Sequence, residues 1–505
     1  MKILYLPLDE RPCNSLLPQR MVAVRRDITL ISPPATLLGS KKVAADPDRL
    51  FTFIENNIDN ANALVISIEM LVYGGLLPSR LHQDDQQLLI ARLDRLLTLT
   101  RRYPHLKVYA FNLIMRTPRY DSSDEEPDYY SEYGFRLFRR AWLIDEQARE
   151  GLNDRQSSEL TTLHEAIPTS VITDYERRRT SNLALLSHTL HQVKEGNIHL
   201  LAIPQDDSAE YGYTAQDQRH VGDVIDKLDL FGRVHLYPGA DEVGAALIAR
   251  ALLDYQQRSC AIYPLFSSTL GPQIVPLYED RPMLESLRAH IAVIGAHLVD
   301  TPEQADLILA INAPGKVMQE SWDQFTNRDV TYSSYRHLPS FTNQIKRLLD
   351  AGKAVIVADG AYANGGDYQL ITLLDRDGTI ERLLSYKGWN TFCNTLGSTL
   401  AQGIIGLEQA DKDNIATNLL HHLLDDVCYQ ANVRMNINRH YLPTLGVDYF
   451  SLGQHTAQVM ATVKQEITNE YRSLLKNSFI NRNIDFQVSS PWNRMFEIDI
   501  MVTIK

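Results

Sequence analysis

Residues 198–208 read IHLLAIPQDDS, an apolar run that ends in two adjacent carboxylates. An apolar run of this length, closed by Pro204 and polar residues, predicts a strand that is buried on both faces. Asp206 and Asp207 then follow the carboxyl end of this strand, the edge at which α/β folds bind their ligands. Two neighbouring carboxyl groups repel each other when both are ionised, so we expect one of them to have a raised pKa and to serve as a general acid. The structural alternative is an Asx turn or a helix N-cap, which Asp-Asp-Ser also favours.

The same pattern of an apolar run followed by polar residues recurs along the chain. Further strands are predicted at residues 2–8, 28–32, 63–68, 107–115, 234–237, 261–266, 306–311, 354–358 and 382–386. Helical patterns separate most of them, for example at residues 84–102, where leucines recur at helical spacing with charges opposite. Strands that alternate with helices are typical of parallel βαβ units.

These units predict an α/β fold that resembles a (β/α)₈ barrel with insertions. We expect residues 1–430 to form the barrel-like domain, and residues 260–315 are the best candidate for an insertion because there are more predicted strands than eight. Residues 431–505 break the regular pattern and predict a small C-terminal α+β appendage. A doubly wound sheet is the alternative. The barrel is preferred because polar clusters follow nearly every predicted strand, whereas an open sheet concentrates its site at one switch point.

Composition narrows the classes of partner. The 505 residues include 50 Lys and Arg against 62 Asp and Glu, for a net charge of −12, which disfavours nucleic acid as a ligand. The first residues lead directly into a short apolar strand and no run approaches membrane-spanning length, so we expect a cytoplasmic protein with no membrane partner. The four cysteines lie far apart without a CxxC pair, which disfavours a disulfide framework or a cysteine metal cluster. The sequence does not indicate an oligomeric state.

Polar residues at the predicted strand ends are the candidate site. Asp206 and Asp207 are the expected catalytic pair. The residues expected to bind substrate are Asp9, Arg11, Glu69, Arg116, Asp241, Glu242, Asn312, Asp359, Asn364, Trp389 and Asn390. Carboxylates and amides bond hydroxyl groups and an aromatic face packs on a pyranose ring, so this set predicts a small carbohydrate as substrate. There is no HExxH motif and no His pair with the spacing taken as that of metal ligands, so we expect no zinc and no cofactor, although carboxylates alone could hold Mg²⁺.

Two expectations concern the arrangement of these residues. The acidic, tyrosine-rich stretch 121–133 predicts either a linker or a lid over a polar ligand. Because parallel strands place their carboxyl ends on one face, we expect six of the polar residues to converge on one pocket. The six are Asp9, Glu69, Asp206, Asp207, Asp241 and Asn390. The alternative is that they are separate helix caps, each exposed to solvent.

Several of these segments also resemble a known family, the one called domain of unknown function 4127. The segments are LPLDERP (6–12), Glu69 with YGG (73–75), PRY (118–120) with the acidic stretch after it, PQDDS (204–208), PGADE (238–242), AYANG (361–365), GWNT (388–391) and PWNR (491–494). The resemblance spans nearly the whole chain. It implies that the family's fold extends over nearly the whole chain, and it implies no particular activity.

A second likeness concerns mechanism. Adjacent aspartates after a middle strand are similar to the dyad of family 84 glycoside hydrolases, barrel enzymes that act on N-acetylhexosaminides. That resemblance implies that the substrate's own acetamide attacks the anomeric carbon. Asp206 would orient the acetamide and Asp207 would be the acid and base. It also implies ligand contacts from the later strands, where Asn312, Asn364, Trp389 and Asn390 lie.

The leading hypothesis is therefore a glycoside hydrolase that acts on a small sugar conjugate, which can be N-acetylated, through the adjacent Asp pair. A retaining or inverting hydrolase with a further base, such as Glu69 or Asp241, is the alternative within that class. A lyase or isomerase that holds Mg²⁺ on its carboxylates is a second enzyme class. A carbohydrate-binding protein without catalysis is the remaining alternative.

Overall fold

The computed structural model describes residues 1–206 and 209–504, which divide into two compact units. Unit 1 consists of Met1–Glu10, Leu30–Gly244 and Tyr278–Asp280, and unit 2 of Arg11–Thr29, Ala245–Leu277 and Arg281–Lys505. The chain therefore passes between the units more than once. The predicted border after residue 430 lies inside unit 2.

Unit 1 is built on a six-stranded sheet with the order β2-β1-β3-β4-β5-β6. Its strands are β1 (Lys2–Leu6), β2 (Thr29–Ile31), β3 (Ala63–Ser67), β4 (Lys107–Phe111), β5 (Leu200–Gln205) and β6 (Val234–Pro238). From β1 to β6 the neighbouring strands are parallel, with Tyr5 opposite Val65 and Ala110 opposite Leu201. All five residues of β3 and all six of β5 are buried, as expected of parallel strands covered on both faces.

Helices cover this sheet and complete its apolar core. The helices of unit 1 are α3 (Pro47–Asn57), α4 (Ile68–Tyr73), α5 (Leu76–Leu81), α6 (Gln86–Thr100), α7 (Tyr130–Arg149), α8 (Asp154–Ala166), α9 (Thr169–Lys194), α10 (Tyr213–Leu228) and the short 3₁₀ helix η1 (Ala35–Leu37). Leu4 and Leu6 of β1 belong to one core cluster with Leu50, Leu93 and Leu190 from α3, α6 and α9. The cluster also takes in alternate residues of β3, β4 and β5, so it lies on one face of the sheet.

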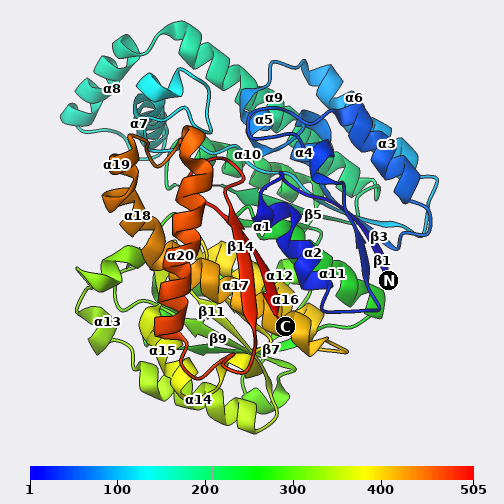
Figure 1. The fold of residues 1–505 in the computed structure, drawn as a ribbon. Coiled ribbons are helices and arrows are strands. Elements are labelled where there is room, and N and C mark those ends of the chain that lie inside the picture. Colours follow the sequence, from blue (N-terminus) through cyan, green and yellow to red (C-terminus); the bar gives the residue numbers. More distant parts are fainter. Residues whose placement is uncertain (207–208, 505) are drawn as a thin grey trace. The chain divides into compact units, whose positions relative to one another are not determined.

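Unit 2 contains a five-stranded parallel sheet with the order β13-β11-β9-β7-β8. Its strands are β7 (Ala261–Phe266), β8 (His297–Leu298), β9 (Leu307–Asn312), β11 (Ala354–Asp359) and β13 (Ser385–Lys387), of which β7, β9 and β11 can be followed in Figure 1. Residues 260–315, predicted as an insertion, supply three of these five strands. Two short strands, β10 (Gln319–Glu320) and β12 (Tyr362–Ala363), form a separate pair.

The helices of unit 2 surround this sheet. They are α1 (Pro12–Ser15), α2 (Leu17–Val22), most of α11 (Val243–Gln256), α12 (Met283–Ile294), α13 (Thr331–Ser334), α14 (Leu338–Asp350), α15 (Tyr368–Arg376), α16 (Phe392–Gly406), α17 (Lys412–His422), α18 (Arg434–His440), α19 (Leu442–Leu445) and α20 (Thr456–Leu474). A π-helix, η6 (Leu423–Val433), joins α17 to α18. The 3₁₀ helices are η2 (Gly271–Gln273), η3 (Pro302–Gln304), η4 (Ser321–Phe325), η5 (Ile380–Arg382) and η7 (Gly453–His455).

The last part of the chain contains a long helix and a pair of strands. Helix α20 packs against β14 (Ile484–Ser489), and the two run side by side in Figure 1. Strand β14 pairs antiparallel with β15 (Asp499–Ile504). The described residues after 430 thus contain helices and an antiparallel strand pair, and they belong to unit 2.

The two large sheets share one strand order. When the strands of each large sheet are numbered along the chain, both sheets contain the order 2-1-3-4-5. The sheet of unit 1 adds β6 at one edge. This order is that of doubly wound α/β sheets, whose ligands bind beyond the carboxyl ends of the strands next to the point where the order reverses. That point lies between β1 and β3 in unit 1 and between β7 and β9 in unit 2. The α/β class with parallel strands is confirmed, while a closed barrel is not shown by these pairings and stays a prediction.

Among the described helices, none combines the length and the apolar character needed to cross a membrane. The expected cytoplasmic location stays a prediction.

Candidate functional site

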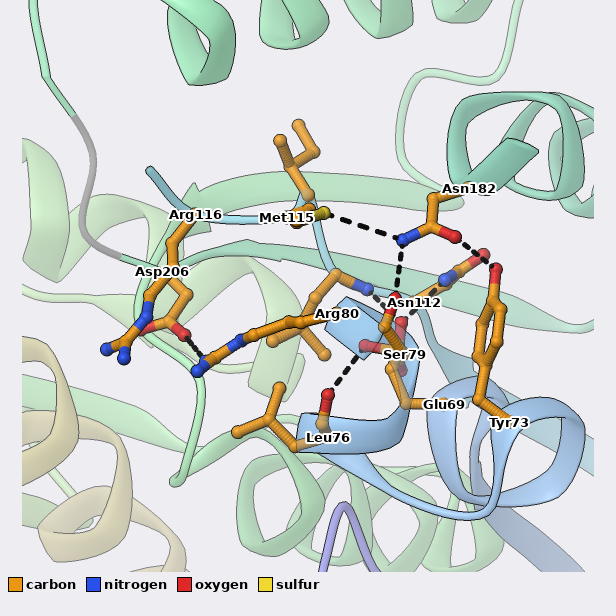
Figure 2. A pocket seen from close by; sticks show the side chains of 12 residues that line it. Glu69, Tyr73, Leu76, Ser79, Arg80, Asn112, Met115, Arg116, Asn182 and Asp206 are labelled. Carbon is orange, nitrogen blue, oxygen red and sulfur yellow. Dashed lines mark hydrogen bonds and ion pairs between the residues drawn. The ribbon is translucent and has the colours of Figure 1, made fainter. Parts of the chain in front are cut away.

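A pocket in unit 1 lies at the carboxyl ends of its central strands. It is lined by Glu69, Tyr73, Leu76, Ser79, Arg80, Asn112, Leu113, Ile114, Met115, Arg116, Asn182 and Asp206 (Figure 2). The space between these atoms is about 310 Å³, part of it open to solvent. Three residues expected from the sequence, namely Glu69, Arg116 and Asp206, therefore lie around one space, after β3, β4 and β5.

Glu69 owes its position to the short segment that links β3 to α4. Ser67 ends the strand and caps the helix by accepting a hydrogen bond from Met70 N at 3.1 Å, which places Glu69 in the first turn. Oε1 of Glu69 accepts hydrogen bonds from Asn112 Nδ2 and Leu113 N, both at 2.7 Å. Burial raises the pKa of this carboxyl group from 4.5 to about 7, although these hydrogen bonds oppose the rise. Glu69 can therefore exchange a proton near neutral pH.

Arg80 reaches the pocket because a glycine pair separates α4 from α5. Gly74 ends α4 with a φ of 85°, and a Cβ atom there would lie 2.5 Å from the carbonyl oxygen of Ala45. Only glycine fits this turn, and α5 then carries Arg80 into the interior. The Nη2 atom of Arg80 donates to Oδ2 of Asp206 at 2.5 Å, and Figure 2 shows the side chain extended toward that carboxylate.

The opposite charges in the pocket form a connected cluster. Arg116, which follows β4, donates from Nη2 to Glu125 and from Nε to Glu126, both at 2.8 Å. The same two glutamates accept from Nη1 of Arg80 at 3.2 Å. Burial alone would lower the pKa of Arg80, but the surrounding carboxylates outweigh it and the pKa is raised. Both arginines are thus held as cations in an enclosed site, with Asp206 as a carboxylate partner.

A neutral hydrogen-bond chain forms the other side of the pocket. The Tyr73 hydroxyl donates to Oδ1 of Asn182 at 2.9 Å, and Nδ2 of Asn182 donates to the Ser79 carbonyl at 3.0 Å. Burial, followed by the charge of Glu69, raises the pKa of Tyr73 well above its ordinary value. Tyr73 therefore stays protonated and neutral, and Figure 2 places it on the same side as Glu69.

Other predicted residues of unit 1 lie outside this lining. Asp207 falls outside the described residues. Asp9, after β1, and Asp241 and Glu242, after β6, are buried but are not among the residues that line the pocket. Glu242 accepts a hydrogen bond from Ala240 N at 3.1 Å, as a turn-forming side chain does. Two of the six residues expected to converge, Glu69 and Asp206, thus line this pocket.

Unit 2 places two predicted residues in a separate buried network. Asn312 ends β9 and lies beside Asp359, which ends β11, and Nδ2 of Asn312 donates to Oδ1 of Asp359 at 2.8 Å. Oδ1 of Asn312 accepts from Ser267 Oγ at 2.9 Å and from Arg336 Nη1 at 3.1 Å. Arg336 Nη1 also lies 2.6 Å from Asp367 Oδ2. Burial, followed by the charge of Asp367, raises the pKa of Asp359 to about 7.

The remaining predicted residues of unit 2 have structural contacts. Asn364 and Asn390 have positive φ angles, and Asn364 N donates to the Asn390 carbonyl at 2.9 Å. The Trp389 ring lies 6.3 Å from that of Phe496, and the Arg11 guanidinium lies 5.0 Å from the ring of Trp492. These contacts order loops, and asparagine tolerates positive φ better than most residues.

Comparison with protein families identifies the chain. The model of a family described as protein of unknown function (DUF4127) matches residues 3–501. The chain belongs to this family. A search of curated proteins finds no match. The resemblance predicted from the sequence is confirmed for the DUF4127 family. The likeness to family 84 glycoside hydrolases stays a prediction, since neither comparison bears on it.

Several pocket residues of this DUF4127 protein were not predicted. Arg80, Ser79, Asn112 and Asn182 line the pocket but were not singled out. Asn112 directly follows the apolar run of β4, so the strand-end rule could have found it. Arg80 and Asn182 lie within helices, where a single polar residue resembles an ordinary exposed one. In the described part of the chain, no group of three or more His, Cys, Asp and Glu side chains is arranged to hold a metal ion.

Proposed function

We propose that this DUF4127 protein is a glycoside hydrolase that acts on a small sugar conjugate, N-acetylated sugars included, in the pocket of unit 1. One observation carries the proposal. Two carboxyl groups line the same pocket in unequal surroundings, since Glu69 is buried with a pKa of about 7 while Asp206 is paired with Arg80 at 2.5 Å. Carboxyl groups whose surroundings differ in this way can divide acid and base roles between them.

In the proposed mechanism Glu69 protonates the oxygen of the leaving group as the glycosidic bond breaks. Asp206, which is paired with Arg80, acts on the anomeric carbon either directly as a nucleophile or by activating water. The hydrogen bonds from Asn112 and Leu113 stabilise the ionised form of Glu69 after it has given up its proton. In the substrate-assisted alternative, Asp206 orients an acetamide and Asp207 supplies the proton.

We expect the purified protein to release the aryl group from at least one member of a panel of aryl glycosides that includes N-acetylglucosaminides. Proton NMR of the first product formed gives its anomeric configuration. Retention of configuration indicates carboxyl groups roughly 5–5.5 Å apart or participation of the acetamide. Inversion indicates carboxyl groups roughly 6.5–9.5 Å apart. Hydrolysis of N-acetylglucosaminides but not of the matching glucosides would support the substrate-assisted route.

The other functional classes correspond to other results of the same assay. Activity that is lost in a chelator and restored by Mg²⁺ would favour the lyase or isomerase. Sugar binding without turnover of any glycoside would favour a binding protein and contradict the proposal. The two carboxyl groups in the pocket argue for the hydrolase, because a site for binding alone has no need of a carboxyl group with a pKa near neutrality.

A further inference from the structure

The two pocket arginines share two carboxylates of the segment between β4 and α7. Oε2 of Glu125 lies 3.2 Å from Arg80 Nη1 and 2.8 Å from Arg116 Nη2. Oε1 of Glu126 lies 3.2 Å from Arg80 Nη1 and 2.8 Å from Arg116 Nε. One oxygen of each glutamate therefore bridges both guanidinium groups. Two guanidinium groups around one oxygen form a receptor for an oxyanion.

The two glutamates differ in how far their side chains are exposed to solvent. The Glu126 side chain is fully buried, whereas that of Glu125 is 18% exposed. Residues 121–129 form neither helix nor strand, and their other charged contacts include Lys41 with Asp124 and Lys42 with Asp128, the latter at 3.7 Å. Glu125 is thus the bridging carboxylate that an incoming ligand can reach and replace, because it faces solvent on a segment without regular hydrogen bonding.

Charge balance favours replacement over simple addition. Among the residues that the structure describes, three carboxylates face this arginine pair: Asp206 is paired with Arg80, and Glu125 and Glu126 are paired with both arginines. A further anion would add to an excess of negative charge in an enclosed site, which is costly. An anion that takes the place of Glu125 leaves the charge of the cluster unchanged. A neutral sugar offers the two guanidinium groups hydroxyl oxygens but no anionic oxygen, and hydrogen bonds to an anionic oxygen are the stronger ones.

We propose that the sugar bound by this pocket carries an anionic group, a carboxylate, sulfate or phosphate, that replaces Glu125 between Arg80 and Arg116. This inference rests on the proposed function, because it names the substrate class of that same site. The acidic segment then acts as an internal occupant of the site in the absence of substrate. The sequence predicts either a linker or a lid for this segment, and the proposed role combines the two. The segment connects β4 to α7 and also covers the arginines.

Binding of free sugars tests the inference without requiring turnover. Isothermal titration at 150 mM salt would compare glucose with glucuronate, glucose 6-sulfate and glucose 6-phosphate. We expect at least one anionic sugar to bind about tenfold or more tightly than glucose, since charge-assisted bonds to Arg are about twice as strong as neutral ones. The anion that binds best shows which oxyanion the arginines accept.

A matched pair of variants isolates Glu125. We expect Glu125→Gln to bind the preferred anionic sugar about tenfold more tightly than the native protein, because a neutral amide competes weakly for the arginines. Asp128→Asn removes the same charge from the same segment, but its carboxylate is fully exposed and lies 3.7 Å from Lys42. We therefore expect Asp128→Asn to leave the affinity unchanged. An equal gain in both variants would mean a general charge effect and would overturn the inference.

The outcomes separate this inference from the proposed function. Equal affinity for glucose and all three anionic sugars in the native protein would overturn the inference, even if neutral glycosides are hydrolysed. Tight binding of an anionic sugar with no hydrolysis of its aryl glycoside would support the receptor and contradict the hydrolase.

Discussion

Glu69→Gln is expected to reduce hydrolysis of glycosides with poor leaving groups by about 10²- to 10⁴-fold, the usual contribution of a general acid. The amide has nearly the same shape, so Oε1 can still accept from Asn112 Nδ2 and Leu113 N, and only the transferable proton is lost. Activated aryl glycosides need little protonation and should lose much less. The measurement is kcat/KM for a series of aryl glycosides of graded leaving-group pKa.

The same variant is expected to be more stable than the native protein above neutral pH. The native state holds the Glu69 proton more tightly than the unfolded chain does, so burial of the ionised carboxylate opposes folding once the pH exceeds 4.5. A rise of the pKa from 4.5 to about 7 corresponds, at about 1.4 kcal/mol for each pH unit, to about 3 kcal/mol at pH 8. At pH 5 the difference falls below about 1 kcal/mol. Urea unfolding at pH 5 and at pH 8 measures this difference in the free energy of unfolding.

Two further variants test whether the changes in activity and stability are specific to Glu69. Glu165→Gln, at an exposed position of α8, should change neither activity nor the pH dependence of stability. Asp207→Asn tests the substrate-assisted route. Selective loss of poor leaving groups in Asp207→Asn, with Glu69→Gln fully active, would assign the proton to Asp207 and contradict our mechanism. Equal stability of Glu69→Gln and the native protein at pH 5 and pH 8 would contradict the raised pKa.

The sequence predicts the strands well because each central strand is buried on both faces. The runs 63–68 and 354–358 consist almost entirely of apolar residues, and the strands β3 and β11 match them to within a residue. Strand order depends on which strands meet in space, and no local pattern encodes it. The polar clusters that favoured a barrel follow the strands of two sheets, each with its own carboxyl edge.

The candidate site was predictable directly after the strands and not further along the helices or in the acidic loop. Glu69 and Asp206 follow β3 and β5, so the rule that parallel strands share a carboxyl edge brings them together. Arg80 enters the pocket through the backbone turn at Gly74, and nothing about an arginine in the sequence indicates that it is buried. Glu125 and Glu126 appear as ordinary acidic loop residues until their partners Arg80 and Arg116 are known.

The two sheets place similar chemistry at corresponding strand ends. In unit 1, Glu69 follows β3 and its amide partner Asn112 follows β4. In unit 2, Asn312 ends β9 and Asp359 ends β11, the corresponding strands of the shared order, so the amide and the carboxyl group have exchanged places. Both carboxyl groups have a pKa raised to about 7 by burial. The unit 2 network differs because Asp367 is paired with the buried Arg336. Replacing Arg336 therefore measures how much this ion pair contributes to stability.

Arg336→Met is expected to reduce the free energy of unfolding by about 3–5 kcal/mol, the usual effect of removing one partner from a buried ion pair. Met fills similar volume but leaves Asp367 with an uncompensated charge beside Asp359, and it removes the donor to Asn312. Urea unfolding at pH 7 gives the value. Arg328→Met is the matched control, since Arg328 is exposed and donates to the neutral side chain of Gln369 at 3.2 Å. We expect that variant to stay within about 0.5 kcal/mol of the native protein.

Acid should rescue Arg336→Met, because the loss comes from buried negative charge. Burial, followed by the charge of Asp367, already raises the pKa of Asp359 to about 7 in the native protein, and loss of the guanidinium raises it further. Lowering the pH from 8 to 5 then protonates Asp359 in the variant and reduces the gap in stability from the native protein. Adding Asp367→Asn to the variant should reduce the gap at pH 8 in the same way. A gap that is equal at pH 5 and pH 8, and unchanged by Asp367→Asn, would mean that Arg336 contributes packing rather than charge.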